Sequence, residues 1–167
     1  MAIVRQIRET DAAPFLELCR KLDEETRFMM LEPGERSTSV EEQSRQIKGV
    51  LLTDNQTILV AEAGGGLVGY VAAYGGDFRR NRHCAQVITG VLQAFSGRGV
   101  GTRLFMELEQ WARRNGVHRL ELTVMAHNDR AVRLYRKMGY EVEGGRRDSL
   151  LVNGSYVDEY YMGKLLS

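Results

Sequence analysis

The sequence predicts a mixed α/β fold with a central sheet of about seven strands flanked by about four helices. Three observations support this prediction. Short β-branched runs alternate with amphipathic segments of helical period. Glycine-centred turns join two pairs of strands, and a glycine-rich stretch follows one strand and opens a helix. The element order β α α β β β α β α β β contains no internal repeat or linker, so we expect one domain over residues 1–167.

A strand and two helices form the first part of the chain. Apolar residues within 3–7 predict the strand, and Asp11 is placed to cap a helix that has Pro14 in its first turn, where a missing N–H does no harm. Ser39 and Glu42 have the spacing of a capping box and predict the second helix. The apolar face of the first helix consists of Phe15, Leu18, Cys19 and Leu22.

The segment between these helices, residues 23–38, is polar and irregular apart from one apolar cluster, Phe28 to Leu31. Irregular segments that carry side chains for binding are common beside functional sites. We therefore interpret this segment as a candidate wall of a substrate site.

The middle of the chain contains three strands and a helix. Residues 57–63 and 67–74 are β-branched runs joined by Gly64-Gly65-Gly66, which predicts a hairpin, and 83–92 is the next strand. A helix follows the glycine-rich stretch and ends near Gly116. Its apolar residues recur at helical spacing: Leu104, Phe105, Leu108, Trp111 and Ala112.

The carboxyl-terminal part begins with a strand over 120–124. Asn128 is placed to cap a short helix, and Gly139 follows the end of that helix. Asn153-Gly154 then gives a strong hairpin signal, so the last two strands should be antiparallel. These strands cover 140–152 and 155–165.

Composition limits the classes of function. The 23 Lys and Arg residues nearly balance the 22 Asp and Glu residues, so no bulk field favours a nucleic acid or an anionic membrane. No apolar run approaches the ~20 residues of a membrane span, and the amino terminus lacks the pattern of a signal peptide. Cys19 and Cys84 have neither disulfide nor metal-site spacing. We expect a cytoplasmic protein without a nucleic-acid partner, a membrane segment or a metal.

The glycine-rich stretch, Ser96-Gly97-Arg98-Gly99-Val100-Gly101, is the main functional signal. Closely spaced glycines between a strand and a helix let the backbone approach an anion, and N–H groups at the start of the helix point toward it. A P-loop would need lysine at the position of Thr102, and a dinucleotide fingerprint would need a glycine or alanine at Thr102 or Leu104. Spacing alone leaves a phosphate site and a tight structural turn equally open.

Two linked motifs narrow this choice. FSGRGVGTRLF and the later LTVMAHNDRAVRLYRKMGY together resemble the cofactor-binding core of the GNAT superfamily of N-acetyltransferases, over about residues 85–142. The family pattern has Gln or Arg, two free positions, Gly, one free position, then Gly or Ala. Gly99 and Gly101 match this pattern, whereas Ser96 replaces the Gln or Arg. One side-chain contact to the pyrophosphate is therefore missing, weakened or supplied by Arg98 instead.

The resemblance implies acetyl-CoA as co-substrate and assigns residues to it. The amides of Gly97, Arg98, Gly99, Val100, Gly101 and Thr102 would hold the pyrophosphate. Backbone groups near Val91 and Leu92 would pair with the pantetheine arm, and Asn128 would lie beside that arm while capping its helix. Tyr135 would lie near the thioester sulfur, although its helical spacing taken alone favours core packing.

Acetyl transfer to an amine needs a polarised carbonyl, a proton for the leaving thiolate and a neutral amine. A backbone N–H near Leu92 is a candidate for the first task and the Tyr135 phenol for the second. Four carboxylates could serve as the base, namely Glu24, Glu25, Glu32 and Asp77, or a water chain could replace them. Glu25 is the first choice because it ends the first helix beside the Phe28 to Leu31 cluster.

The function expected from these residues is N-acetylation of a primary amine in a small molecule or amino acid. Acetylation of a protein N-terminus or lysine, and a non-catalytic acetyl-CoA-binding module, are the alternatives that the sequence leaves open. A homodimer is also possible, because long strands of a terminal hairpin can pair between subunits.

Overall fold

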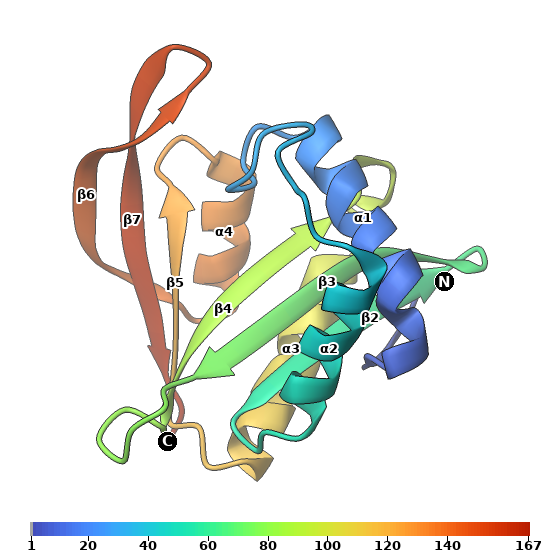
Figure 1. Ribbon diagram of the computed structural model, residues 1–167. Coiled ribbons are helices and arrows are strands. Elements are labelled where there is room, and N and C mark those ends of the chain that lie inside the picture. Colours follow the sequence, from blue (N-terminus) through green and yellow to red (C-terminus); the bar gives the residue numbers. More distant parts are fainter. Residues whose placement is uncertain (1) are drawn as a thin grey trace.

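The computed structural model describes residues 2–167, and its elements follow the predicted order (Figure 1). Two short 3₁₀ helices, Glu9–Asp11 and Gln93–Phe95, are added to that order. The strands are β1 (Ile3–Gln6), β2 (Gln56–Ala63), β3 (Gly66–Gly75), β4 (Cys84–Val91), β5 (Arg119–Met125), β6 (Glu141–Val152) and β7 (Ser155–Leu165). The helices are α1 (Ala12–Glu25), α2 (Val40–Leu51), α3 (Val100–Arg114) and α4 (Asp129–Lys137).

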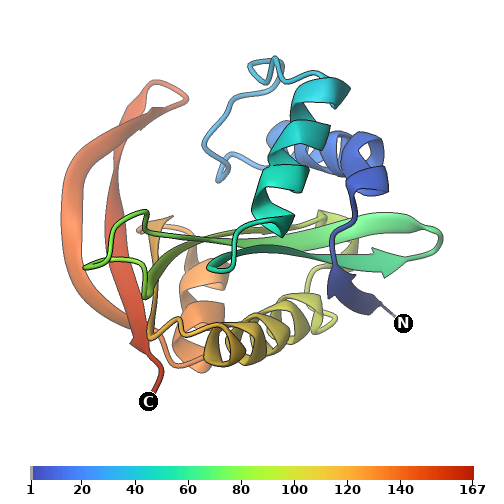
Figure 2. The same ribbon diagram turned by 60° about the horizontal axis from the view of Figure 1, so that its bottom comes forward.

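Residues 2–167 form one seven-stranded sheet in the order β1-β2-β3-β4-β5-β7-β6. All neighbouring strands are antiparallel except β4 and β5, which α3 connects in parallel. Figure 2 shows α1 and α2 on one face of the sheet and α3 and α4 on the other. The predicted mixed α/β architecture is therefore confirmed.

Two apolar clusters hold these layers together. On the α3 face, Leu104, Phe105 and Leu108 are almost fully buried against the inward side chains of the sheet. On the opposite face, residues of α1 and α2 such as Leu22 and Ile47 pack against β2 and β3. Each of these helices has apolar residues at helical spacing and buries the resulting apolar stripe against the sheet. The sheet is therefore covered on both faces over β1 to β4.

The turns follow the predicted chemistry in most places. Ser39 Oγ accepts the Glu42 N–H at 3.1 Å at the start of α2, and Asn153 and Gly154 form the turn between β6 and β7 with φ of 50° and 82°. The prediction that Asp11 caps α1 is wrong in one respect, because its carboxylate makes no capping bond to that helix.

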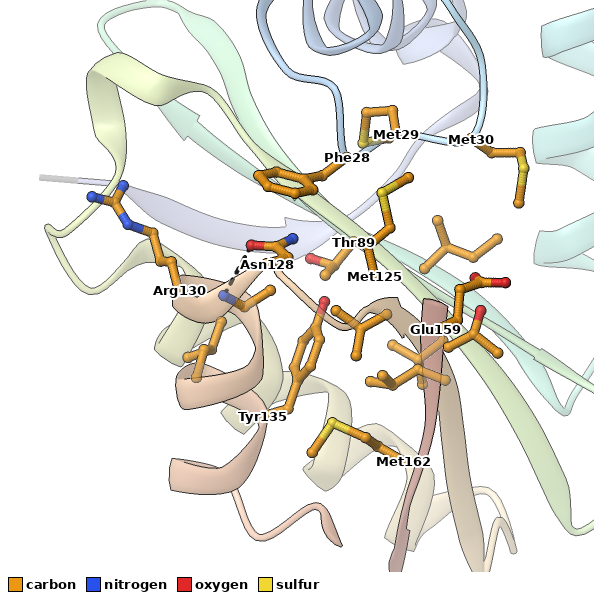
Figure 3. Close-up of a pocket in the computed structure, with 18 of the residues that line it drawn as sticks. Phe28, Met29, Met30, Thr89, Met125, Asn128, Arg130, Tyr135, Glu159 and Met162 are labelled. Carbon is orange, nitrogen blue, oxygen red and sulfur yellow. Dashed lines mark hydrogen bonds between the residues drawn. The ribbon is translucent and has the colours of Figure 1, made fainter. Parts of the chain in front are cut away.

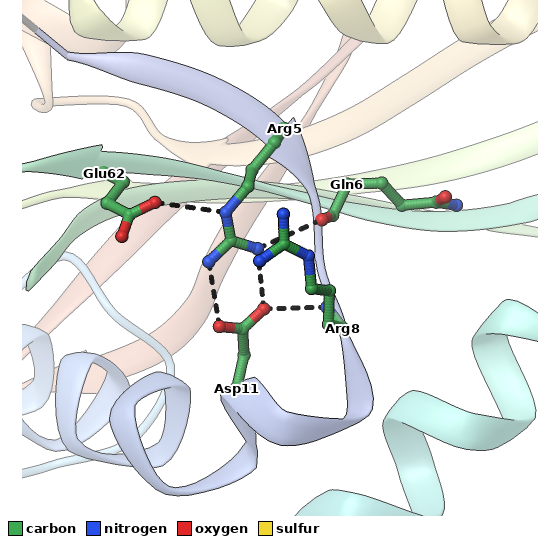
Figure 4. Close-up of polar contacts among 5 residues, drawn as sticks. All are labelled: Arg5, Gln6, Arg8, Asp11 and Glu62. Carbon is green, nitrogen blue, oxygen red and sulfur yellow. Dashed lines mark hydrogen bonds and ion pairs between the residues drawn. The ribbon is translucent and has the colours of Figure 1, made fainter.

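The Asp11 carboxylate instead joins a network at the amino terminus (Figure 4). It accepts two hydrogen bonds from the Arg5 guanidinium, at 2.7 and 2.9 Å, and one from the Arg8 N–H at 2.7 Å. Arg5 also pairs with Glu62 of β2 at 3.2 Å. The hydrogen bond from Arg5 is the main cause that lowers the pKa of Asp11. A cation across the turn therefore outcompetes the helix end for this carboxylate.

Candidate active site

The site begins where two parallel strands separate. Within residues 2–167, β4 and β5 pair at three positions, from Cys84 with Arg119 to Gln86 with Glu121. Beyond these pairs β4 continues to Val91 and β5 to Met125, and Figure 1 shows the two strands diverging. The divergence leaves one edge of each strand without a sheet partner, so polar backbone groups are available there to a ligand.

A cleft of about 1050 Å³ occupies this divergence and reaches both faces of the sheet. On the α3 face its lining includes Gly101, Leu134 and Tyr135. On the opposite face it is lined by the segment from Thr26 to Met30, which follows α1. The cleft can therefore hold one ligand from each side, with their reactive ends meeting between β4 and β5.

The glycine stretch forms the α3 end of the cleft. Gly99 is the N-cap of α3 with φ of 81°, a conformation that side chains with a Cβ rarely adopt. The first three N–H groups of α3 precede its first helical hydrogen bond, from Arg103 N to Gly99 O at 3.0 Å. At Gly101 a Cβ would lie 2.9 Å from the Leu134 side chain, so α4 packs closely against this turn. The arrangement is suited to an anion such as a pyrophosphate.

Val91 and Leu92, the two strand positions predicted to contact the cofactor, direct their backbone N–H groups to opposite edges of the strand. The Leu92 N–H donates to Val68 O at 2.8 Å, and the Leu92 carbonyl accepts the Phe95 N–H at 2.9 Å. This part of the prediction needs correction, because the Leu92 N–H is already used by β3. Successive residues of a strand direct their backbone groups to opposite edges, so the Val91 N–H faces the gap left by β5. Val91 also lines the cleft.

Asn128 and Tyr135 lie together on the α4 side of the cleft (Figure 3). Asn128 Oδ1 accepts the Ala131 N–H at 3.3 Å, which caps α4 and leaves the amide NH₂ for other partners. The Tyr135 side chain is 7% exposed and packs against Phe105, with ring centroids 5.5 Å apart. Its hydroxyl points into the cleft in Figure 3. Burial raises the pKa of Tyr135, so the phenol stays protonated at neutral pH.

The opposite wall carries the predicted apolar cluster, of which Phe28, Met29 and Met30 line the cleft. Figure 3 shows these side chains above Asn128 and Met125. The Phe28 ring also meets the His127 ring, with centroids 5.2 Å apart, so the wall contacts the β5–α4 turn.

A buried ion pair holds this wall in place. Asp23, in the last turn of α1, accepts bonds from Arg36 at 2.7 and 3.0 Å, and its side chain is 2% exposed. The hydrogen bonds to Asp23 raise the pKa of Arg36. Because Asp23 and Arg36 lie on either side of the apolar cluster in the chain, this pair closes the loop that presents it.

The four carboxylates considered as bases are distributed unevenly. Glu25 lines the cleft, whereas Glu24, Glu32 and Asp77 are exposed outside its lining. Glu25 Oε1 accepts the Gln93 N–H at 2.5 Å and so connects α1 to the turn before α3. Its role as a base stays a prediction.

Two further residues of this region were not found from the sequence. Lys137 Nζ lies 3.5 Å from Thr102 Oγ1, which places a cation at the start of α3. Glu159 of β7 is 4% exposed and lines the cleft. Strand alternation places Glu159 on the same face as Tyr161, but only the pairing of β7 with β5 brings that face to the cleft.

Two absences concern the described part of the chain. Among residues 2–167, no group of three or more His, Cys, Asp or Glu side chains is arranged to hold a metal ion. In the same range, no helix combines the length and apolar character needed to cross a membrane.

The fold and the cleft define a class of protein. A parallel strand pair that diverges beside a glycine-capped helix, with a buried phenol at the divergence, suits an enzyme that binds an extended ligand ending in a phosphate group. The chain matches the model of the acetyltransferase (GNAT) family over residues 16–140. It belongs to this family.

Three relatives support the assignment. The chain is similar to the L-amino acid N-acetyltransferase AaaT of Escherichia coli, with 36% identity over 64% of this chain and 67% of AaaT. It is 39% identical to the N-alpha-acetyltransferase RimI of Mycobacterium tuberculosis over 61% of each chain. A solved GNAT acetyltransferase of Streptococcus pneumoniae superposes with a TM-score of 0.96 at 29% identity, over 99% of this chain and all of that one.

The protein is an acetyl-CoA-dependent N-acetyltransferase. Two solved structures with this fold, YncA of Salmonella typhimurium at 22% identity and a phosphinothricin acetyltransferase of Sinorhizobium meliloti at 20% identity, contain acetyl-CoA. The open edge of β4 and the free N–H groups of α3 fit such a molecule, because they offer donors at both an extended arm and a pyrophosphate.

Proposed function

We propose that the protein acetylates the α-amino group of an amino acid with an apolar side chain, or of a similar small amine. The main support for this proposal is that the cleft opens on both faces of the sheet. Acetyl-CoA would enter on the side of α3 and α4, and the acceptor would enter on the side lined by Phe28 to Met30. Met and Phe side chains form an adaptable apolar surface for such a side chain. The similarity to AaaT supports the same class of acceptor.

Within this proposal, the backbone N–H groups of Gly97 to Thr102 bind the pyrophosphate and Arg98 adds a positive charge beside it. Arg98 is exposed and lies over the Phe95 ring, 5.4 Å from its centroid, so it can reach a ligand on the surface. The Val91 backbone and the Asn128 NH₂ position the pantetheine arm. Acetyl-CoA supplies the activated acetyl group, and Tyr135 gives its phenolic proton to the departing sulfur.

Binding can be tested without turnover. Calorimetric titration of acetyl-CoA should give a measurable Kd for the wild type. Gly99→Ala and Gly99→Glu share the backbone strain at φ of 81°, but the second also places a carboxylate at the anion site. We expect Gly99→Glu to bind at least tenfold more weakly than Gly99→Ala. Equal affinities of the two variants would contradict the pyrophosphate assignment.

The role of Tyr135 has a matched control in Tyr140. Both phenols are buried with raised pKa values, but Tyr140 is not part of the cleft lining and its hydroxyl has no partner within residues 2–167. We expect Tyr135→Phe to lower kcat by about 100-fold, as loss of a general acid does, while Tyr140→Phe leaves kcat unchanged. A kcat of Tyr135→Phe within twofold of the wild type would refute the assignment.

The acceptor can be identified by release of free thiol from acetyl-CoA across amino acids, polyamines and peptides. Turnover of methionine, phenylalanine or leucine is expected. Preference for a peptide N-terminus would instead support the second candidate, which the similarity to RimI favours. The same screen separates both from a binding module, since a module would bind acetyl-CoA without turnover.

The cytoplasmic setting and a homodimer remain parts of the proposal. β6 is an edge strand, and Leu151 and Tyr156 near the tip of the β6–β7 hairpin are 60% and 67% exposed. Exposed edges with apolar side chains favour association. A single monomeric species in sedimentation at micromolar concentration would exclude the dimer.

A further inference from the structure

The acceptor side of the cleft contains one carboxylate that is buried but incompletely bonded. Glu159 is 4% exposed and pairs in register with Met125 across β5 and β7. Its Oε1 accepts the Ser149 hydroxyl at 2.8 Å and lies 3.4 Å from Arg146. Among the described residues, Oε2 has no hydrogen-bond partner. Because Glu159 lines the cleft and the protein supplies no donor to Oε2, this oxygen can accept a hydrogen bond from a ligand.

The other carboxylates of the cleft are already used. Arg119 binds Glu121 at 2.9 Å and Glu143 at 2.5 Å, so both are neutralised at the closed end of the divergence. Glu25 Oε1 receives the Gln93 N–H. Arg146 is 48% exposed in its side chain and contacts Glu159 at the long limit of an ion pair, so it neutralises Glu159 weakly.

The surroundings of Glu159 fit an amine next to an apolar group. Figure 3 shows Glu159 on the side of the pocket opposite Asn128, with Met125 between them and the Phe28 to Met30 wall above. The charged and titratable groups around this space are Arg146, which contacts Glu159, and the groups that line the cleft: Glu25, Arg27, Arg119, Glu121, Arg130, Tyr135, Glu143 and Tyr161. Arg119 is paired with Glu121 and Glu143, and among the described residues neither Arg27 nor Arg130 forms an ion pair with Glu159, so its Oε2 can accept a positive ligand group.

We propose that Glu159 binds the ammonium group of the acceptor through Oε2 and accepts its proton. This inference rests on the proposed function. The proton moves from the ammonium nitrogen to the carboxylate, the freed nitrogen forms a bond to the acetyl carbon, and the bond from that carbon to sulfur breaks. Tyr135 protonates the sulfur and regains a proton from the new amide nitrogen, so the products are the N-acetyl compound, free thiol and one proton on Glu159.

The test compares Glu159→Gln with the rival Glu25→Gln and with Glu107→Gln, an exposed position on α3. For Glu159→Gln we expect kcat/KM for the amine to fall about 100-fold at pH 7. The ratio of wild-type to variant kcat/KM should shrink about tenfold for each pH unit up to the pKa of the amine. The reason is that a growing fraction of the amine is already neutral in solution, so the variant needs no base. The calorimetric Kd for acetyl-CoA should stay within twofold, and Glu107→Gln should match the wild type.

Other outcomes distinguish a failure of the proposed function from a failure of the role assigned to Glu159. No acetyl-CoA binding by the wild type would overturn the proposed function itself. Wild-type turnover with a Glu159→Gln variant within threefold at pH 7, or the pH-dependent loss appearing in Glu25→Gln instead, would overturn the role of Glu159 alone. If Glu159→Gln does not fold, Ser149→Ala removes a donor from Oε1 and should shift the acidic limb of kcat/KM to higher pH. An unmoved limb would overturn the assignment.

Discussion

Replacing Arg36 by methionine should destabilise the protein strongly, because it leaves the Asp23 carboxylate buried without a counter-charge. Asp23 is 2% exposed in its side chain and Arg36 is 20% exposed, and two hydrogen bonds join them. Breaking a buried pair from one side costs about 3–5 kcal/mol. Since Arg36 keeps some exposure, we expect a loss of about 3 kcal/mol, at the lower end of that range.

Thermal and urea unfolding, followed by circular dichroism, measure this loss. In a domain of this length, each kcal/mol lowers Tm by about 2–4 °C, so Arg36→Met should melt about 6–12 °C below the wild type. Arg45→Met removes an exposed arginine of α2 and should change stability by less than about 0.5 kcal/mol.

A second variant identifies the cause. If the uncompensated charge is responsible, adding Asp23→Asn to Arg36→Met should recover at least about 1 kcal/mol, since a neutral amide is less costly to bury. A loss below about 1 kcal/mol for Arg36→Met, or a double variant no more stable than the single one, would refute the reasoning. The loop closed by the pair carries Phe28 to Met30, so KM for the acceptor should rise more than the Kd for acetyl-CoA.

Three further predictions concern other contacts. Asp11→Asn should cost about 1.5–3 kcal/mol at pH 7 by urea unfolding. Because Arg5 lowers the pKa of Asp11 from 3.8, this difference from the wild type is present above pH 3.8 and should vanish as the pH falls further. Lys137→Met should weaken acetyl-CoA binding several-fold at low salt and less in 0.5 M salt, and an effect independent of salt would argue against a charge contact. Phe28→Ala should raise KM for the acceptor at least fivefold with little change in kcat, whereas Leu52→Ala, at a position 79% exposed, should change neither.

The fold could be predicted from local patterns because most elements are defined by neighbours in the sequence. Ser39 caps α2 through an N–H three residues away, and Asn153-Gly154 sets its own turn. Asp11 is the instructive failure. Its expected cap is a local interaction, but Arg5 on β1 provides a stronger partner that depends on how the strand enters the sheet.

The site could be predicted in part. The glycine stretch, Asn128 and Tyr135 lie along one continuous segment, so a linear motif reaches all of them. The backbone N–H of Leu92 points toward β3, whereas that of Val91 points away from it. Which of the two faces the cleft depends on the register of β3 against β4. Glu159 enters the cleft through the pairing of β7 with β5, and that pairing crosses a distance in sequence that no local pattern spans.

The short parallel contact between β4 and β5 has a mechanical consequence. Three residue pairs, Cys84 to Gln86 with Arg119 to Glu121, join the panel formed by β5, β7 and β6 to the rest of the sheet. We expect the sheet to flex at this short strand pairing, and a ligand bound along the open edge of β4 to restrict that motion. At a hundred times Kd, a ligand stabilises the form that binds it by about 2.7 kcal/mol. Amide exchange along Arg119 to Met125 should therefore slow when acetyl-CoA is added, while exchange in the hairpin of β2 and β3 changes little.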